Sequence, residues 1–133
     1  MKLTSRSEYA LLALVFLARH QREGLFPAQA IATAQEIPLR FLEQILLVLA
    51  RARYLRSSKG KGGGFQLRKP AAEISLAEVI RLFDGALAPT ESASRYFYEP
   101  TPIEKESKLL GVFREVRNYV ARKMEKTTLA DMV

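Results

Sequence analysis

Several residue types that build reactive sites are missing or scarce in this chain of 133 residues. It has no cysteine, no tryptophan and a single histidine, His20. Without cysteine there is no thiolate metal ligand, no ligand for a Cys-bound iron-sulfur cluster, no disulfide and no thiol nucleophile. One imidazole is also too few for the usual histidine metal clusters. We therefore expect no metal site and no cofactor.

Catalytic combinations are also lacking. No serine or threonine has an evident histidine base, and no pair of carboxylates stands apart from the surface acids and helix caps. We expect that the protein is not an enzyme.

Long apolar runs are absent. The longest, from Tyr9 to Ala18, is well short of the roughly 18 residues that span a bilayer, and it follows polar residues rather than a charged signal region. We expect a soluble, cytoplasmic protein without a membrane partner. The length and the 48% hydrophobic composition suit one compact domain, or one domain with an appended association helix.

Acidic residues are unevenly scarce. The net charge is +7, and residues 1 to 70 hold 12 basic and 4 acidic residues, whereas residues 71 to 133 hold 9 and 10. Seven basic residues and no acid lie between Arg51 and Lys69. A solvated basic face is the ordinary explanation, but charge confined to one segment is typical of a protein that binds a polyanion. The seven residues are Arg51, Arg53, Arg56, Lys59, Lys61, Arg68 and Lys69.

Three helices are expected in the first half of the chain. Ser5-Arg6-Ser7-Glu8 fits a capping box that opens a helix, and the residues from Ala10 to Leu17 are apolar on nearly all sides, which predicts the buried centre of the domain. Pro27 is placed to begin a short second helix that ends near Ala34. Ile37-Pro38 breaks the chain and opens a third helix to about Arg53.

The third helix has two different faces. Helical spacing predicts a core face of Phe41, Leu42, Ile45, Leu46, Leu49 and Ala52. The opposite stripe is polar apart from one leucine. Two helices joined by a few residues, the second with an exposed polar stripe, indicate a helix-turn-helix. The stripe consists of Arg40, Glu43, Gln44, Leu47 and Arg51.

A basic glycine segment follows this helix. Residues 54–57 and 65–68 can pair as two short strands, and Pro70 stops the hairpin. A P-loop is excluded by its missing pattern, and the dinucleotide motif by Phe65 at the last glycine position and by the lack of a following helix. A mobile surface hairpin has similar glycines, but the position after a polar-striped helix favours a DNA-binding wing. The candidate wing contacts are Ser58, Lys59, Gly60, Lys61, Gly62 and Gly63.

The next part of the chain is a short helix and an irregular stretch. Ser75-Leu76-Ala77-Glu78 is a capping box, and Gly85 is placed to end the helix, whose Val79, Ile80 and Phe83 we expect to face inward. Residues 86–101 show no periodicity and hold the aromatics Tyr96, Phe97 and Tyr98. We expect a sensing or docking loop, or a simple linker.

A long helix is expected at the end. Thr101-Pro102-Ile103-Glu104 combines a capping box with proline at the first helical position, and a helix from there to about Lys126 would have about 25 residues and a length of about 37 Å. Its apolar stripe exceeds what a small domain can cover, so we expect it to pack against a second copy; packing on its own domain is the alternative. The expected division is therefore residues 1–85, 86–101 and 102–133. The stripe consists of Leu109, Leu110, Phe113, Val116, Val120 and Met124.

Taken together, the motifs resemble the redox-response-factor family, the IscR, NsrR and CymR type of bacterial winged helix-turn-helix transcription regulator, over essentially the whole chain. The resemblance implies a mainly α fold with a small β-hairpin, and a homodimer, more often a repressor, on a roughly palindromic operator in double-stranded DNA. It also implies that Glu43 and Gln44 face base edges, that Arg40 and Arg51 contact bases or phosphates, and that Lys59 reaches the minor groove. For Glu43, an ion pair with Arg40 or another nearby base is the alternative. The matching segments are residues 1–10, Ile37-Pro38, 41–45, the wing 59–65, 78–80 and 127–131.

The chain departs from the family at one point. Cluster-binding relatives carry three cysteines in the irregular stretch, where this chain has Thr90-Glu91-Ser92-Ala93-Ser94 and Tyr98-Glu99-Pro100-Thr101. We therefore expect a signal other than a Cys-ligated cluster, with the operator and effector open. The alternative function is an interaction module that docks another protein, such as a metabolic enzyme, through the loop 86–101.

Overall fold

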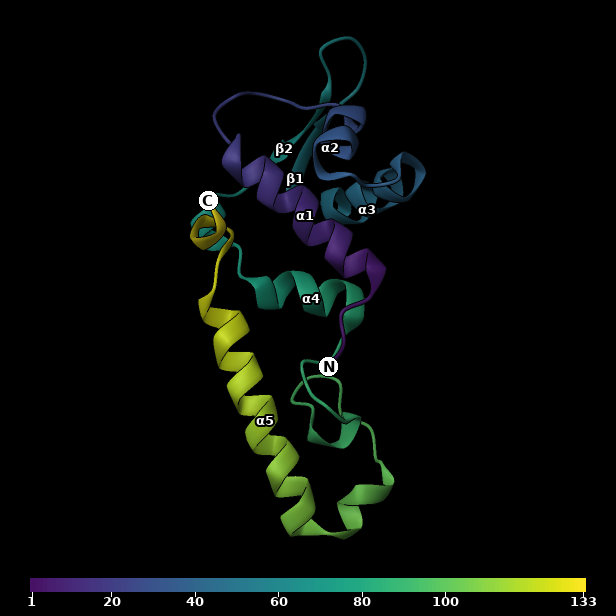
Figure 1. Cartoon of the computed structure of the whole chain (residues 1–133), viewed down its shortest axis with the longest axis vertical. Helices are drawn as coiled ribbons and strands as arrows, with labels where there is room; N and C mark the ends of the chain where they lie inside the picture. The colour runs from purple at the N-terminus through teal and green to yellow at the C-terminus, as the bar shows by residue number, and fades with distance from the viewer.

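The computed structural model describes all residues from 1 to 133 (Figure 1). Its fold is mainly α with one small β-hairpin, as expected. The first three helices and the hairpin form one end of the molecule, α4 crosses the middle, and α5 with the loop 86–101 forms the other end (Figure 1). The elements are α1 (Ser5–Arg19), α2 (Ala28–Gln35), α3 (Leu39–Arg51), β1 (Leu55–Ser58), β2 (Gly64–Leu67), α4 (Leu76–Asp84) and α5 (Ser107–Lys126).

Helix α1 begins at Ser5, but its cap differs from the expected one. The N-cap is Thr4, whose hydroxyl accepts a hydrogen bond from the Ser7 amide, and Ser7 in turn accepts from the Thr4 amide. The expected pairing of Ser5 with Glu8 is therefore wrong by one residue. Thr4 caps the helix in place of Ser5, because its hydroxyl also donates a hydrogen bond to Asp84 at the end of α4. This bond joins the two helices.

Helix α3 presents one face to the core and one to solvent. Leu42, Ile45, Leu46 and Leu49 are buried, as expected from their spacing. Phe41 is a correction, because its side chain is 39% exposed. Its ring packs edge-to-face against Tyr9, with an interplanar angle of 74° and ring centroids 5.4 Å apart.

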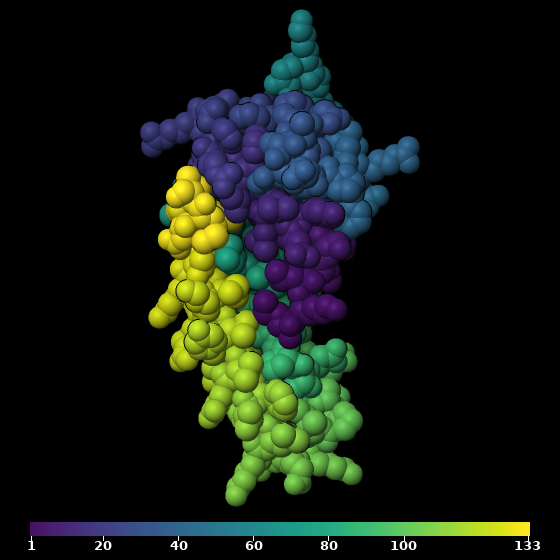
Figure 2. Space-filling view, viewed as in Figure 1, coloured from purple at the N-terminus to yellow at the C-terminus, as the bar shows by residue number.

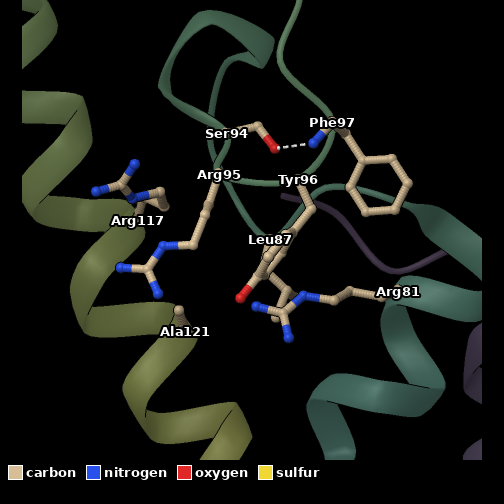
Figure 3. Close-up of a pocket in the computed structure, with 8 residues that line it drawn as sticks. All are labelled: Arg81, Leu87, Ser94, Arg95, Tyr96, Phe97, Arg117 and Ala121. Atoms are coloured by element: carbon tan, nitrogen blue, oxygen red, sulfur yellow. Dashed lines mark hydrogen bonds between the residues drawn. The ribbon is translucent and has the colours of Figure 1, made fainter.

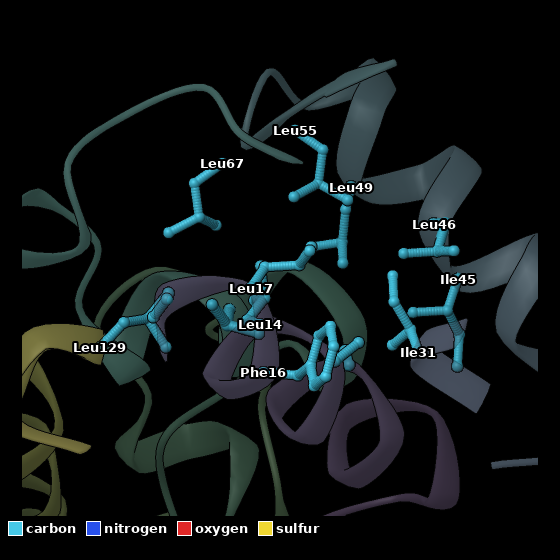
Figure 4. Close-up of a cluster of buried hydrophobic side chains, with 14 of the residues drawn as sticks. Leu14, Phe16, Leu17, Ile31, Ile45, Leu46, Leu49, Leu55, Leu67 and Leu129 are labelled. Carbon is cyan, nitrogen blue, oxygen red and sulfur yellow. The ribbon is translucent and has the colours of Figure 1, made fainter. Parts of the chain in front are cut away.

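One large hydrophobic cluster holds this end together. Leu14, Phe16 and Leu17 of α1 lie between α3 and the hairpin, with Ile31 of α2 beside them (Figure 4). Because α1 contacts α2, α3, α4 and β2, its nearly all-apolar sequence is explained by burial at the centre of the domain.

The hairpin pairs β1 with β2 in antiparallel register, with Leu55 opposite Leu67 and Ser58 opposite Gly64. Both strands are shifted by one residue from the expected ranges, within ordinary boundary scatter. A third segment joins them, because Phe26 forms a bridge with Phe65. No sequence pattern predicted that bridge.

Helix α4 matches its prediction. Ser75 is the N-cap, Glu78 completes the capping box, and Gly85 ends the helix with a φ of 80°. Val79 and Ile80 are buried, while Phe83 is only partly buried. After Gly85 the chain is irregular, as expected, apart from a single 3-10 turn (Glu91–Ala93).

The start of the last helix is a second correction. A 3-10 turn (Pro102–Lys105) is followed by an extended residue, Glu106, and α5 begins only at Ser107. The Thr101 hydroxyl does not cap a helix, because it is hydrogen-bonded to Thr90 and Ser92. Helix α5 therefore has 20 residues, which corresponds to a length of about 30 Å instead of about 37 Å.

The expected apolar stripe of α5 divides into two faces. Leu110 and Phe113 pack against Ala88, Ala93 and neighbouring side chains of the loop, and Val120 and Met124 pack against Ile80 and Leu87 near α4. These four side chains therefore cover their own chain, which was the alternative to dimerisation. The other face stays open, with Leu109, Val112, Val116 and Tyr119 between 43% and 67% exposed.

The C-terminal residues return to the first domain. Thr128 and Asp131 form a capping box for a 3-10 turn (Leu129–Met132), and Leu129 is fully buried in the main cluster. The Leu129 amide donates to the Ile74 carbonyl at 3.0 Å, and the Leu76 amide donates to the Thr127 carbonyl at 2.9 Å. The segment 102–133 is therefore built into the same fold as residues 1–85.

Candidate nucleic-acid interface

The polar stripe of α3 lies on the solvent side of that helix. The side chains of Arg40, Glu43, Gln44, Leu47 and Arg51 are all exposed, opposite the buried leucines and Ile45. The chain has only two ion pairs within 4.0 Å, His20 with Glu23 and Arg81 with Glu125. Glu43 is therefore not paired with Arg40 or another base, and its carboxylate is available to an external donor.

The turn between α2 and α3 sets the direction of that stripe. Glu36 ends α2 in the left-handed region with a φ of 55°, and Pro38 is the N-cap of α3. Between them Ile37 is 4% exposed and packs in the main cluster. This buried side chain anchors the short turn between the two helices, and two helices joined by such a short turn are the arrangement of a helix-turn-helix.

The hairpin tip projects beyond the rest of the domain (Figure 2). Ser58, Lys59, Gly60, Lys61 and Gly62 are exposed there, and Gly63 is partly exposed. The tip is closed by a hydrogen bond of 3.0 Å from the Gly63 amide to the Gly60 carbonyl, with a φ of 85° at Gly60. Wing and α3 share one end of the molecule, away from the loop 86–101 (Figure 1).

The base of the wing is anchored by a contact that the sequence patterns did not predict. Phe26 and Phe65 exchange two backbone hydrogen bonds of 2.9 and 2.7 Å. A Cβ atom at Gly64 would lie 2.3 Å from the carbonyl oxygen of Phe26, so only glycine allows the strands to approach this closely. The Phe26 ring also packs on the Phe16 ring, with the two ring centroids 5.1 Å apart. One feature of the sequence could have indicated this contact: Phe26 directly precedes Pro27, and the residue before a proline favours extended backbone.

Further cations surround the predicted contacts. Arg56 lies on β1 with its side chain exposed, and Arg53 sits in the turn after α3 with a φ of 68°. Arg68 and Lys69 follow β2 and are also exposed. None of the four is within ion-pair distance of a carboxylate. The uninterrupted basic run in the sequence therefore consists of exposed cations that no acid of the chain neutralises by an ion pair.

The junction of α3 and the wing is also held from behind. Tyr54 donates a hydrogen bond to Glu78 in the first turn of α4, and the Lys69 ammonium lies 5.1 Å from the centre of the tyrosine ring. Burial and the Glu78 carboxylate raise the pKa of Tyr54 to about 12. The phenol is thus a neutral structural donor across the neutral pH range.

The same arrangement of helix and wing is found in known proteins. A family model described as Rrf2, an iron-dependent transcriptional regulator, matches residues 3–133. The chain belongs to the Rrf2 family. It is therefore an HTH-type transcriptional regulator, and the family identifies DNA as its partner.

Individual Rrf2 relatives agree over long stretches. A protein of Mycobacterium tuberculosis, named as an HTH-type transcriptional regulator, is 36% identical over 99% of this chain and 81% of its own length. The regulator IscR of Photorhabdus laumondii is 39% identical over 71% of this chain and 58% of its own. The crystal structure of oxidised Staphylococcus aureus CymR is 32% identical, with a TM-score of 0.76 over 99% of this chain and 95% of that one.

The family description mentions iron, which side chains of this chain would have to bind. In this Rrf2 chain no three side chains of histidine, cysteine, aspartate or glutamate come together as a metal site. The loop 86–101 offers only the carboxylates of Glu91 and Glu99 and no thiol. The residues of this loop therefore do not fit a Cys-ligated iron centre. The chain also contains no helix with the length and apolar character needed to cross a membrane.

Proposed function

We propose that this protein is a sequence-specific regulator that binds double-stranded DNA as a homodimer on a roughly palindromic operator. The observation that carries the proposal is the exposed stripe of α3, where Arg40, Glu43 and Gln44 face solvent and neither Arg40 nor Glu43 has an ion pair within the chain. A helix of this kind fits the major groove, where a glutamate accepts from cytosine and a glutamine pairs with adenine. Arg51 and the other basic side chains of this region neutralise phosphates of the DNA.

The wing supplies the second part of the contact. Lys59 and Lys61 stand at the exposed tip, and the glycine backbone around them allows close approach to a sugar-phosphate chain. Lys59 is proposed to reach the minor groove, whereas Ser58 and the glycines at positions 60, 62 and 63 lie along the sugar-phosphate chain of the DNA.

The proposed dimer uses the open face of α5. Leu109, Val112, Val116 and Tyr119 follow alternating spacings of three, four and three residues, the alternation found in a coiled-coil seam. Four large exposed apolar side chains in one row are unfavourable in water, and a second copy would cover them. Of the six stripe residues expected from sequence, Leu109 and Val116 belong to this face.

The proposal is for binding and not for catalysis, in the bacterial cytoplasm and with a signal that is not a Cys-ligated cluster. Repression by occupying promoter DNA is the expected outcome. The relatives are named as transcriptional regulators, which supports this function and not the alternative of a protein-docking module.

The test is selection of bound duplexes from a random pool at fixed salt. The expected result is enrichment of one inverted repeat whose half-sites are about one helical turn, roughly 34 to 36 Å, apart. Salt-sensitive binding to all duplexes without enrichment would contradict the sequence-specific function.

A further inference from the structure

A cluster of arginines lies on the side of α4 that faces away from the wing (Figure 1). The loop 86–101, α4 and α5 meet there around a small pocket, and Arg81, Arg95 and Arg117 come to it from the three elements (Figure 3). The pocket continues into an open recess of about 310 Å³ that Arg95 and Arg117 share with Arg122 and Glu125. We call the two together the arginine recess.

The charges in the arginine recess do not balance. Four guanidinium groups line it, with one carboxylate, Glu125, which pairs with Arg81 at 2.8 Å. Arg95, Arg117 and Arg122 have no carboxylate within 4.0 Å. Three positive groups that share one concave surface repel one another, and a partly enclosed site screens that repulsion less than open water does.

Arg117 shows the imbalance most clearly, because its side chain is half-buried. It donates only to neutral oxygens, the Ala93 carbonyl at 3.0 Å and the side-chain oxygen of Asn118. These bonds hold the guanidinium in place at the rim of the recess without neutralising it. A half-buried, fixed guanidinium without an ion pair carries a desolvation cost that a bound anion would offset.

The loop is held so that its arginine faces the same space. Ser94 accepts a hydrogen bond of 2.9 Å from the Phe97 amide, which closes a turn over Arg95 and Tyr96 (Figure 3). The Tyr96 ring lies 4.9 Å from the Arg81 guanidinium and covers one side. Leu87, Phe97 and Ala121 line the pocket with apolar side chains. The site thus combines several guanidinium forks with a surface for a carbon skeleton.

Other occupants fit less well. The recess lies between α4, the loop 86–101 and α5, on the side of α4 away from the wing and α3, so operator DNA on α3 does not reach it (Figure 1). Val112 and Val116 of the open apolar row lie on a different flank of α5 from Arg122 and Glu125, and only Tyr119, at the end of the row, adjoins Arg122. A second copy on Val112 and Val116 therefore leaves Arg95 and Arg117 open.

We propose that the arginine recess binds a small organic anion carrying two or more carboxylate or phosphate groups. Guanidinium groups suit both chemistries, because each presents paired donors that match two oxygens of a carboxylate or a phosphate. Arg95 and Arg122 are the proposed ligands from the loop and from α5, with Arg117 between them.

The test is calorimetric titration of the full chain, without DNA, with citrate as the carboxylate probe and pyrophosphate as the phosphate probe. Sodium chloride of equal ionic strength is the blank. One site per chain is expected for at least one probe, and the tighter of the two identifies the anionic group. Arg95→Gln and Arg122→Gln should each weaken that binding about tenfold. Both side chains are exposed and unpaired, so the variants should fold, which circular dichroism checks.

Arg114→Gln is the matched control, because Arg114 is exposed on the same helix but does not line the recess. It should bind like the wild type. No binding of either probe above the blank would overturn the proposal, as would equal weakening by the control. Loss of the dimer in Arg122→Gln without any effect on binding would show that the recess serves a second copy and would also overturn it.

Discussion

The hydroxyl of Tyr54 donates a hydrogen bond of 3.2 Å to a carboxylate oxygen of Glu78, and this bond joins the turn between α3 and β1 to α4. The other oxygen of Glu78 accepts from the Ser75 amide at 2.8 Å and completes the cap of α4. One carboxylate thus fixes both the start of α4 and the junction that carries the wing.

Replacing Tyr54 by phenylalanine should lower the free energy of unfolding by about 1 kcal/mol at neutral pH, the usual value of one hydrogen bond. The advantage of the wild type should depend on pH. The pKa of Tyr54 is raised from 10.0 to about 12 in the folded state, so the unfolded chain loses this proton first. The stabilisation is complete below about pH 10 and is lost as pH rises towards about 12.

Urea titrations of both proteins at increasing alkaline pH measure this difference, and the absorbance of phenolate gives the pKa directly. The variant serves as the control for all other titrating groups. A constant difference between the two proteins from neutral to alkaline pH would contradict the coupling to Glu78.

Gly64 and Gly111 form a second, matched pair of tests. At Gly64 the φ is 145° and a Cβ would lie 2.3 Å from the Phe26 carbonyl oxygen, whereas at Gly111 in α5 a Cβ meets nothing within 4 Å. Gly64→Ala should therefore destabilise by about 2 kcal/mol or more. Gly111→Ala should stabilise by roughly 0.5 to 1 kcal/mol, because alanine is the better helix former. Equal effects in urea unfolding would show that the wing is not anchored at Phe26.

The sequence predicted those helices whose ends and faces depend on residues a few positions apart. The cap of α4 depends on Ser75 and Glu78, three residues apart, and the amphipathic spacing of α3 separates Leu42 and Ile45 from Glu43 by geometry alone. For the same reason the exposed stripe of α3, and with it the main part of the candidate site, follows from helical spacing in the sequence.

Long-range contacts explain the failures. Thr101 has the pattern of a helix cap, but its hydroxyl bonds to Thr90 and Ser92 and the helix begins six residues later. The burial of Leu129 and the Phe26–Phe65 bridge depend on partners more than 30 residues away. The arginine recess is likewise invisible in sequence, because its residues come from three separate elements.

The wing lysine should contribute one phosphate contact. Lys59 is exposed at the tip of the hairpin and unpaired. Lys59→Ala should weaken operator binding and make the slope of log affinity against log salt shallower by about 0.9. Fluorescence anisotropy with a labelled operator at several salt concentrations measures it. Lys108→Ala at the exposed start of α5 is the control, and a loss of slope in both variants alike would reflect general charge only.

The carboxylate of Glu43 should affect specificity more than affinity. Since it has no ion pair inside the protein, Glu43→Ala should leave the unfolding free energy nearly unchanged. Discrimination at one or two base pairs should relax by about 1 to 3 kcal/mol. Competition between the operator and single-base variants measures this, with Glu115→Ala on α5 as the control. If the ranking of competitors stays the same, Glu43 does not face a base edge.

Val116 tests the proposed dimer. Its side chain is 43% exposed within one chain, so Val116→Glu should hardly change the stability of the monomer. In a symmetric dimer the open row of one chain packs against the same row of the other. Each chain therefore brings one new carboxylate into the interface, where it is away from water and has no partner. A cost of several kcal/mol is expected. Sedimentation equilibrium should show the dimer dissociating at concentrations where the wild type and Arg114→Glu remain paired. Because the two halves of a palindrome are held by one dimer, operator affinity should fall together with dimerisation. An unchanged association constant would assign the open row of α5 to another contact.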